Sequence, residues 1–421
     1  MNKISNISFT VKHNICTGCG VCEGACPSKA ISMQVIKGNF RPVVNEEFCK
    51  NEKGCHRCYD SCPGIGINLR ELAEATFTDK EIVQDEFVGK YLKCFTGHSN
   101  DYEIRYHCAS GGMVSQFLIW LLENDKIDGA VVTAFDKDSP LMVRSYIATT
   151  REEVLAAKSS KYAPVTLNRA IKDIKNAKGN RYIIVGVPCH IEGFRKFERL
   201  DHRFKEKITG YFAIYCSSGR SFYLTEHVFK HRHIDISKLS YFAYRDNGCL
   251  GNMVAKGDDM FYEERFQDYY QPLRSFFVPR RCTMCIDHYG ELGDVSFGDI
   301  HIDPYIDDTI GVNSLVVRNR KFLNWLYDAK QDGIISLDEI TVELLNKSQV
   351  MARVKKYRNS AFVRFNHAMG KVVPRYDVLP KGGNIVKLFV SYIHTNIQQT
   401  IGNHKSLWFL IDILKGKGSK R

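Results

Sequence analysis

The spacing of apolar residues predicts a mixed α/β fold over most of the chain. Apolar side chains recur at helical spacing over residues 113–122, and helical patterns continue over 151–159 and 167–178. Apolar runs predict strands over 127–135, 142–149, 181–186 and 211–215, with later strands near 239–244, 295–298 and 311–318. Strands that alternate with helices in this way indicate an α/β or α+β core with several parallel strands.

Two regions outside this core have a different character. Residues 1–75 are rich in Cys, Gly and Pro and predict two short hairpins and turns, and 76–90 reads as a connector. In the tail, apolar residues recur at helical spacing at Ile385, Leu388, Phe389, Tyr392, Ile393 and Ile397, and the chain ends in basic residues. We expect this helix to pack on its own domain, with a solvated basic end. The alternative is peripheral contact of a basic amphipathic helix with an anionic membrane surface.

Cysteine spacing near the N-terminus gives the strongest chemical signal. Residues 16–27 read C-T-G-C-G-V-C-E-G-A-C-P, the ligand run of a bacterial 4Fe–4S ferredoxin, and Cys49 with residues 55–63 forms a second run. The fourth cysteine of each run points to the other cluster. We therefore predict one cluster on Cys16, Cys19, Cys22 and Cys62, and another on Cys49, Cys55, Cys58 and Cys26. Zinc and disulfides fit this spacing less well, because zinc sites favour widely separated CxxC pairs and disulfides need an oxidising compartment.

Composition describes an ordinary globular protein. With 421 residues, 44% hydrophobic and 25% charged, two or three domains are expected. No signal peptide opens the chain and no run reaches the roughly 18 apolar residues of a membrane span, so we expect a cytoplasmic protein without a transmembrane segment. The net charge of +12 is spread along the chain, and we predict no nucleic-acid partner. A basic surface equally suits an acidic redox partner or an anionic coenzyme.

Four further cysteines lie where strands of the predicted core end. Cys189 follows one strand, Cys216 follows another, and Cys282 and Cys285 form a C-T-M-C pair. Because the ends of parallel strands converge at one sheet edge, these thiols could hold a third 4Fe–4S cluster. On spacing alone, Cys189 and Cys216 could equally be ordinary buried cysteines. We take Cys94, Cys108 and Cys249 first as packing residues.

Two segments suggest an anionic cofactor. Ser110, Gly111 and Gly112 open an apolar helix and leave backbone N–H groups that could face a phosphate. Residues 158–162, K-S-S-K-Y, combine cations, hydroxyls and an aromatic ring. A simple tight turn and a solvated surface are the ordinary alternatives for these two segments. The G-x-G-x-x-G of a standard nicotinamide site is absent after the first strand.

Several motifs, in order, resemble the beta-subunit family of coenzyme F420 hydrogenases and dehydrogenases. They are C-A-S-G-G at 108–112, K-S-S-K-Y-A-P at 158–164, V-G-V-P-C-H-I at 185–191, F-A-Y-R at 242–245, and R-C-T-M-C-I-D with G-D-V-S-F-G-D at 281–299. The resemblance covers roughly residues 90–345. It differs at Cys108 and His190, where relatives often carry a small hydroxylated residue and glutamine, so the substrate could differ from F420.

The resemblance implies a flavoprotein with a 4Fe–4S cluster beside the flavin. Carried over by position, Ser110, Gly111 and Gly112 would meet FAD phosphates, and Lys161, Tyr162, Gly186, Val187 and Pro188 would lie at the flavin. Cys189, Cys216, Cys282 and Cys285 would hold the third cluster, and Asp299 would shape the pocket. The implied domains are a ferredoxin-like domain over 1–75, a flavin-binding region over 88–165, a third-cluster region over 166–345 and a helical basic tail over 346–421.

These features predict an iron–sulfur flavoprotein oxidoreductase. Electrons would pass from ferredoxin or a partner subunit through the clusters to FAD, and on as a hydride to a small organic acceptor. The acceptor would be F420 or another substrate. Many bacterial members of the family that the chain resembles occur together with polysaccharide-biosynthesis functions, so a substrate from that chemistry is the other expectation. The sequence identifies no catalytic residue. Two alternatives are an electron-transfer subunit that feeds a partner enzyme, and a zinc-ligated nucleic-acid-binding protein.

Overall fold

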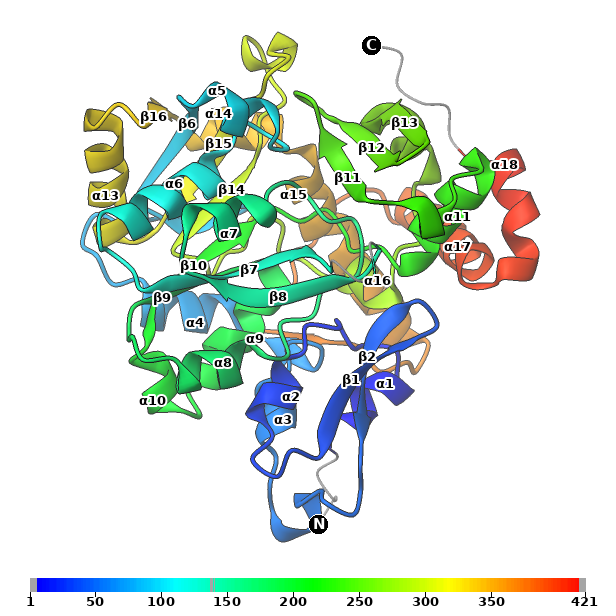
Figure 1. Ribbon diagram of the computed structural model, residues 1–421. Coiled ribbons are helices and arrows are strands. Elements are labelled where there is room, and N and C mark those ends of the chain that lie inside the picture. Colours follow the sequence, from blue (N-terminus) through cyan, green and yellow to red (C-terminus); the bar gives the residue numbers. More distant parts are fainter. Residues whose placement is uncertain (1–5, 137–138, 140, 416–421) are drawn as a thin grey trace.

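The computed structural model describes residues 6–136, 139 and 141–415, and its centre is an eight-stranded mixed β-sheet (Figure 1). The strand order is β16-β6-β15-β14-β10-β9-β7-β8. Four neighbouring strands run parallel: β7 (Gly129–Phe135), β9 (Tyr182–Gly186), β10 (Ile208–Ile214) and β14 (Val295–Asp299). The outer strands pair antiparallel with their inner neighbours: β8 (Val143–Ala148), β15 (Asn313–Val317), β6 (Lys93–Ser99) and β16 (Ile335–Ile340). The predicted mixed α/β core with several parallel strands is confirmed.

Helices cover both faces of this sheet and give three layers. The alternation of side chains along a strand sends Phe212 to one face and Tyr211 to the other. On the first face lie α6 (Met113–Glu123), α7 (Arg151–Ala156) and α13 (Arg320–Gln331). On the second face lie α4 (Leu69–Thr76), α8 (Ala170–Asn176), α9 (Pro188–Glu198) and α10 (His202–Lys205). The segments that follow β9, β10 and β14 therefore meet at one edge of the sheet.

A smaller unit lies beside the main sheet, on the right in Figure 1. It contains an antiparallel sheet of β11 (Tyr241–Asp246), β12 (Asn252–Gly257) and β13 (Met260–Arg265). The helices α11 (Phe222–Arg232), α12 (Phe266–Tyr269), α17 (Ile385–Asn403) and α18 (Ile411–Leu414) lie around it. Residues from this sheet, α11 and the C-terminal helices share one apolar core, so the tail belongs to this unit.

The ferredoxin-like domain differs from the expected pair of hairpins. It holds one hairpin, β1 (Ile31–Ile36) with β2 (Asn39–Val44), and short helices α1 (Ser8–Lys12), α2 (Val21–Ala25) and α3 (Arg57–Asp60). Each C-x3-C pair spans one helical turn because its members are four residues apart, so helices α2 and α3 replace the second hairpin. The expected connector after this domain instead contains a small hairpin of β4 (Val83–Asp85) and β5 (Gly89–Tyr91).

Segments from the distant C-terminal region hold the ferredoxin-like domain against the core. β17 (Arg375–Tyr376) pairs in parallel with β3 (Gly66–Ile67). The Asp377 carboxylate then accepts hydrogen bonds from the backbone N–H groups of Arg70 (2.8 Å) and Glu71 (3.3 Å) at the start of α4. Before β17, the chain forms the helices α14 (Val342–Ser348), α15 (Val350–Val354) and α16 (Ser360–Ala368). Another short helix, α5 (Tyr102–Tyr106), follows β6.

The tail helix forms as predicted, but the expectation that its apolar stripe packs on the protein is wrong. Ile385, Phe389, Ile393 and Ile397 are exposed, whereas Tyr392 is buried. The reason is that the buried face of α17 is made largely of polar and small residues, which contact backbone groups of residues 275–278. Among the described residues, no helix is both long and apolar enough to cross a membrane, as expected.

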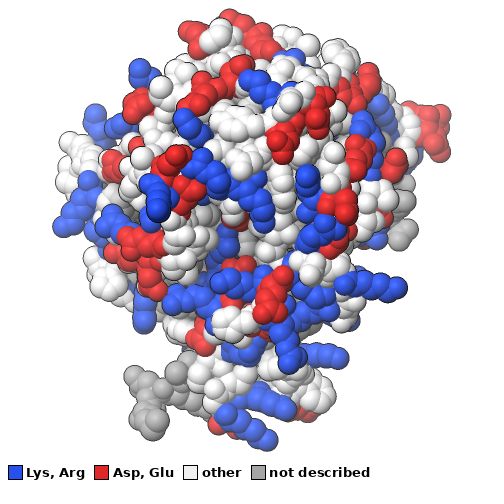
Figure 2. Space-filling model, turned by 90° about the vertical axis from the view of Figure 1, so that its left-hand side faces the viewer, with Lys and Arg blue, Asp and Glu red and all other residues white. Residues whose placement is uncertain are grey.

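The net positive charge is less evenly spread than the sequence analysis expected. Residues 167–207, which include α8 and α10, contain eleven Lys or Arg and five Asp or Glu. Figure 2 shows Lys and Arg side chains crowding the lower part of this face, over the ferredoxin-like domain and the part of the core directly above it. This basic surface, defined here by residues 167–207 and the adjoining ferredoxin-like domain, borders the predicted clusters.

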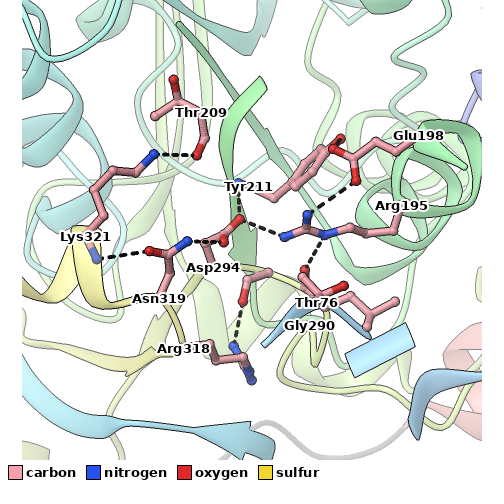
Figure 3. Close-up of polar contacts among 12 residues, drawn as sticks. Thr76, Arg195, Glu198, Thr209, Tyr211, Gly290, Asp294, Arg318, Asn319 and Lys321 are labelled. Carbon is pink, nitrogen blue, oxygen red and sulfur yellow. Dashed lines mark hydrogen bonds and ion pairs between the residues drawn. The ribbon is translucent and has the colours of Figure 1, made fainter. Parts of the chain in front are cut away.

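A buried charged network joins the sheet to α9, below the residues that start β14 (Figure 3). The Asp294 carboxylate accepts hydrogen bonds from Arg195 (2.8 Å), from the Tyr211 backbone N–H (2.8 Å) and from Asn319 (2.9 Å). The Tyr211 hydroxyl donates to Glu198 at 2.9 Å, and the Arg195 guanidinium lies 4.4 Å from the Tyr211 ring centre. Burial raises the pKa of Glu198, so loss of a donor there is costly.

Replacing Tyr211 with Phe should therefore lower the free energy of unfolding by about 2 kcal/mol, the usual value of a hydrogen bond to a charged group. The phenyl ring keeps the packing and only the donor to Glu198 is lost. Chemical denaturation of the oxygen-free protein measures this difference. Tyr102→Phe on the exposed surface is the matched control and should change stability by less than about 0.5 kcal/mol. Equal stability of both variants would contradict the account of the network.

Candidate redox site

The cysteines predicted for the first cluster lie together in the ferredoxin-like domain. They are Cys16, Cys19, Cys22 and Cys62, and all are buried. Burial raises the pKa of Cys19 to about 12, and the nearby Cys62 thiol contributes to the rise. The backbone N–H groups of Gly18 and Gly64 donate to the sulfurs of Cys16 (3.4 Å) and Cys62 (3.3 Å). Such N–H···S hydrogen bonds are the means by which a protein tunes a bound cluster.

The cysteines predicted for the second cluster line one cavity. They are Cys26, Cys49, Cys55 and Cys58, and Pro27, Ile31 and Val44 form apolar parts of the same wall. Burial raises the pKa of Cys58 to about 11, with smaller rises from Cys26, Cys49 and Cys55. A buried thiol of this kind keeps its proton at neutral pH unless a metal ion replaces it. Four thiols around an apolar cavity fit a bound cluster.

The structure also brings together the four cysteines that the resemblance assigned to a third cluster. Cys189 lies in the first turn of α9, Cys216 follows β10, and Cys282 and Cys285 lie on and just after the 3-10 turn Arg280–Met284. Burial is the main cause that raises the pKa of the Cys189 thiol. The nearby acidic groups raise it further, namely Cys19, Glu192, Cys216 and Cys282. Burial raises the pKa of Cys216 to about 12, with a contribution from both Cys282 and Cys285.

Polar residues from the C-terminal region support this third set. The Lys355 ammonium, buried to 1% exposure, donates to the Cys216 carbonyl at 2.8 Å. The Asn359 side chain donates to the Cys285 carbonyl at 2.7 Å. A buried cation here would offset the negative charge of thiolates that hold a cluster. The sequence analysis missed both residues because it treated residues beyond 345 as a tail, and their spacing to the cysteines carries no local signal.

The first and third sets are held close by a tight contact between domains. The Cys19 carbonyl accepts a hydrogen bond from the Leu167 backbone N–H at 2.9 Å. Gly20 has φ +85°, and a Cβ there would lie 2.1 Å from Thr166 Oγ1 and 2.7 Å from the Asn168 nitrogen. Only glycine lets the cluster loop approach the core so closely. The cysteines therefore form a series that runs from the ferredoxin-like domain into the edge of the main sheet.

The second cysteine set is arranged around a cavity. Across the part of the chain that the structure describes, no three His, Cys, Asp or Glu side chains form a group that could hold one ion. The second cysteine set surrounds a cavity instead, as a four-iron cluster requires, because each thiolate binds a different iron. Cys94 and Cys108 lie in apolar cores, in keeping with their role as packing residues.

Ser110, Gly111 and Gly112 form a tight turn before α6. Gly111 and Gly112 have φ of +105° and +78°, and a Cβ on Gly111 would lie 2.8 Å from the Gly311 carbonyl oxygen. The N-cap residue Gly112 offers no side chain to α6, and the Met113 N–H donates to the Asn313 side chain at 3.1 Å. The positive end of the helix dipole would still favour an anionic group at this turn. The Ser110 hydroxyl bonds the Asp299 carboxylate.

Lys161 and Tyr162 lie in the loop after α7. The Lys161 ammonium donates to the carbonyls of Ala157 (2.6 Å), Lys158 (2.6 Å) and Ser159 (3.0 Å), and burial lowers its pKa to about 7. These hydrogen bonds hold residues 157–161 in a compact turn. The Tyr162 ring centre lies 4.3 Å from that of Tyr270 and 5.4 Å from that of Phe266. Burial raises the pKa of Tyr162 to about 12, so its hydroxyl stays protonated.

Gly186, Val187 and Pro188 connect β9 to α9 at the same sheet edge. Their loop is tied to the Lys161–Val165 segment through His190, whose Nε2 lies 3.2 Å from the Val165 carbonyl oxygen. Burial lowers the pKa of His190 to about 4, so the ring is neutral. Only β10 separates β9 from β14, and Gly186 is in register with Ser296, three residues before Asp299, so Gly186 and Asp299 are roughly 14 Å apart. An extended dinucleotide could reach both.

An ion pair between Arg245 and Asp299, which the sequence analysis did not predict, organises this edge. Arg245, at the end of β11, contacts the Asp299 carboxylate at 3.0 Å, and its other donors bond the carbonyls of Ala109 and Leu250. Arg245 thus links the turn before α6 to the ends of β11 and β14. The motifs F-A-Y-R and F-G-D contain these two residues, but nothing in the sequence pairs them.

Cysteine sets in series, leading to a sheet edge suited to an anionic cofactor, define an iron–sulfur redox protein. A 4Fe–4S dicluster domain matches residues 15–67. The N-terminal and C-terminal models of the coenzyme F420 hydrogenase/dehydrogenase beta subunit match residues 94–172 and 179–343. The chain therefore belongs to the coenzyme F420 hydrogenase/dehydrogenase beta-subunit family, as the motifs predicted.

Individual proteins with similar sequences carry names from the same family. Coenzyme F420-dependent sulfite reductase of Methanocaldococcus jannaschii is 26% identical over 325 residues, which are 74% of this chain but 45% of that protein. Coenzyme F420 hydrogenase subunit beta of Methanosarcina barkeri is 25% identical over 52% of this chain and 74% of its own, and that of Methanococcus voltae is 23% identical over 68% and 99%. The chain thus spans less than half of the sulfite reductase.

The fold is shared with a solved structure. A chain of the F420-reducing NiFe hydrogenase complex from Methanosarcina barkeri superposes with a TM-score of 0.54 at 21% identity. The match covers 70% of this chain and 98% of the other. The similarity shows that the two chains share a fold.

Proposed function

We propose that this chain takes electrons from a protein donor through three 4Fe–4S clusters to FAD, which reduces a two-electron organic acceptor. The observation that carries the proposal is the close approach of the first and third cysteine sets through Cys19 and Cys189. When bound, the clusters would pass single electrons and the flavin would join two of them in a hydride. The chain's own residues supply ligands, spacing and burial.

Each predicted ligand set has a distinct part in this proposal. The set with Cys58 lies farthest from the core and would receive electrons, and the set with Cys19 would pass them inward. The set with Cys189 lies at the sheet edge beside the proposed flavin residues. There the turn of Ser110, Gly111 and Gly112 at the amino end of α6 would bind phosphate, and the aromatic wall of Tyr162, Phe266 and Tyr270 would pack on the ring.

The names of the relatives suggest the acceptor and the assembly. Several act with coenzyme F420, so F420 is the first acceptor to test, and the relatives named as hydrogenase subunits suggest a partner subunit as donor. Cys108 and His190 lie near the proposed pocket and differ from the family pattern, which favours a modified acceptor. If the chain only feeds a partner, it will hold iron yet reduce no small acceptor alone.

Metal and flavin analysis of protein purified without oxygen tests the proposal. Three four-iron clusters predict about twelve iron atoms per chain together with one flavin. Addition of F420 to the reduced protein should then oxidise the flavin. Zinc in place of iron, or iron without any flavin, would contradict the proposed function.

The basic surface suggests how the donor docks. Lys172 and Lys178 on and after α8 are exposed and belong to this surface. Replacing both with Glu should slow electron uptake from an acidic ferredoxin at low salt by about tenfold or more, since steering of a charged partner scales with the surface field. Rapid mixing with reduced ferredoxin measures the rate.

Two controls make this prediction specific. Lys347→Glu on α14, an exposed lysine outside the basic surface, should leave the rate unchanged. High salt should remove the difference between variant and natural protein. A rate that is insensitive to both salt and Lys172/Lys178 would place the donor elsewhere.

A further inference from the structure

Helix α17 presents its apolar face to solvent. Val386 is 67% exposed and Val390 is 60% exposed, and Ile385, Phe389, Ile393 and Ile397 lie on the same side. At 100° per residue these side chains fall within one continuous stripe along the first three to four turns. A helix on the surface of a globular protein normally packs such a stripe against the core. An apolar stripe that faces solvent therefore indicates an interaction site.

Specific contacts prevent the stripe from turning inward. The opposite face of α17 bonds the backbone of residues 275–278, because Gln398 accepts from the Ser275 N–H at 3.2 Å and Gln399 donates to the Val278 carbonyl at 2.9 Å. The Tyr392 hydroxyl donates to Asn366 at 3.0 Å. At Gly402 a Cβ would lie 1.5 Å from the Phe276 carbonyl oxygen, so this side of the helix sits directly on the chain beneath.

Further apolar side chains are exposed in the segment that follows α17. Phe409 is 66% exposed and Ile413 is 73% exposed, on the turns that follow. We call the exposed apolar residues of 385–397 with Phe409, Ile413 and Leu414 the C-terminal apolar face. These residues belong to α17 and to the two short helices that follow it in the chain.

The charge near the C-terminal apolar face is mainly positive, although Asp412 lies between Phe409 and Ile413 and pairs with Lys415 at 2.8 Å. No Asp or Glu occurs from residue 378 to residue 411, while Lys381, Lys387 and Lys405 do. The last 51 residues hold nine Lys or Arg and two Asp, a large share of the net charge of +12. Apolar side chains flanked by cations complement the interface of an anionic bilayer, where apolar groups enter the acyl boundary and lysines face lipid headgroups.

We propose that the C-terminal apolar face docks this protein on an anionic membrane surface. Exposed Phe389 and Phe409 would sit at headgroup depth, with Lys387 near the lipid phosphates. The helix would lie along the surface, since no described helix is able to span a membrane. Because α17 rests on residues 275–278, just before the loop of Cys282 and Cys285, docking would bring the sheet edge close to the bilayer.

Vesicle flotation of the full chain, purified without oxygen, tests the proposal. We expect binding to vesicles of phosphatidylcholine mixed with phosphatidylglycerol, and at least tenfold weaker binding to phosphatidylcholine alone. The double variant Val386→Asp, Val390→Asp should lose binding by tenfold or more. Lys387→Glu should weaken it by about fivefold or more, because each charge near the surface contributes about that factor.

A matched control separates this face from general stickiness. Phe261→Asp changes a side chain that is 64% exposed on β13 and should bind vesicles like the natural protein. Iron content and thermal unfolding of every variant show that the fold is retained. Failure to float with anionic vesicles overturns the proposal, as does equal binding by the Val386/Val390 variant. A loss of self-association in that variant, without any vesicle binding, would reject the membrane and assign the face to contact between two copies.

Discussion

Replacing Cys282 with Ala is expected to remove about four of about twelve iron atoms per chain, because one of three four-iron clusters loses a ligand. Electron flow from the donor to the flavin should fall to background. The reason is that the third cysteine set lies between the ferredoxin-like domain and the proposed flavin site, with Cys189 adjacent to both Cys19 and Cys282. Iron analysis and rapid mixing with reduced ferredoxin measure the two effects.

The Cys282 variant must be judged against a cysteine outside the three sets. Cys249→Ala is the control, because Cys249 has no predicted ligand role and lies near Arg245 and Asp299, away from the cluster residues. It should keep all the iron. The ferredoxin-like domain should remain loaded in the Cys282 variant, so its two clusters should still accept electrons. Unchanged iron in that variant would remove the third cluster from the account.

Replacing Arg245 with Met is expected to lower the free energy of unfolding by about 3–5 kcal/mol and to abolish flavin retention. The stability loss follows because the Asp299 carboxylate, 3.0 Å from Arg245, is left without its buried partner. The flavin loss follows because Arg245 also fixes the Ala109 carbonyl, and with it the turn of Ser110, Gly111 and Gly112. Chemical denaturation and flavin fluorescence after gel filtration report the two quantities.

A double variant separates the structural and binding effects of Arg245. Arg245→Met with Asp299→Leu removes both charges, and replacement of a whole buried pair by apolar residues is often neutral in stability. Stability should therefore recover while flavin binding stays lost, since the carbonyl of Ala109 remains unfixed. Arg169→Met, at an exposed arginine before α8, serves as the control for arginine loss. Full flavin retention by the double variant would reject the role of Arg245.

The parts of the structure that the sequence predicted are those encoded locally. The strands at 129–135, 182–186 and 208–214 are dense apolar runs, and the cysteine runs place each C-x3-C pair on one helical turn. β6 was missed because its sequence K-C-F-T-G-H-S shows neither alternation nor a continuous apolar run. Its pairing with β15 and β16 on both sides overrides the weak propensity.

The parts that the sequence could not predict depend on distant contacts. The apolar pattern of α17 predicts a helix but not its orientation, which is set by Gln398 and Gln399 bonding residues 275–278. Likewise Arg245 meets Asp299, and Lys355 meets Cys216, across more than fifty residues of chain. Only the folded sheet edge brings these partners together, so no local spacing announces them.

Reductive titration of the oxygen-free protein with a one-electron reductant tests the central claim most directly. Three clusters that take one electron each and a flavin that takes two predict about five electrons per chain. The Cys282→Ala variant should take about one fewer. An uptake of about two electrons by the natural protein, with no flavin signal, would leave only the ferredoxin-like domain as a redox unit and contradict the proposed path.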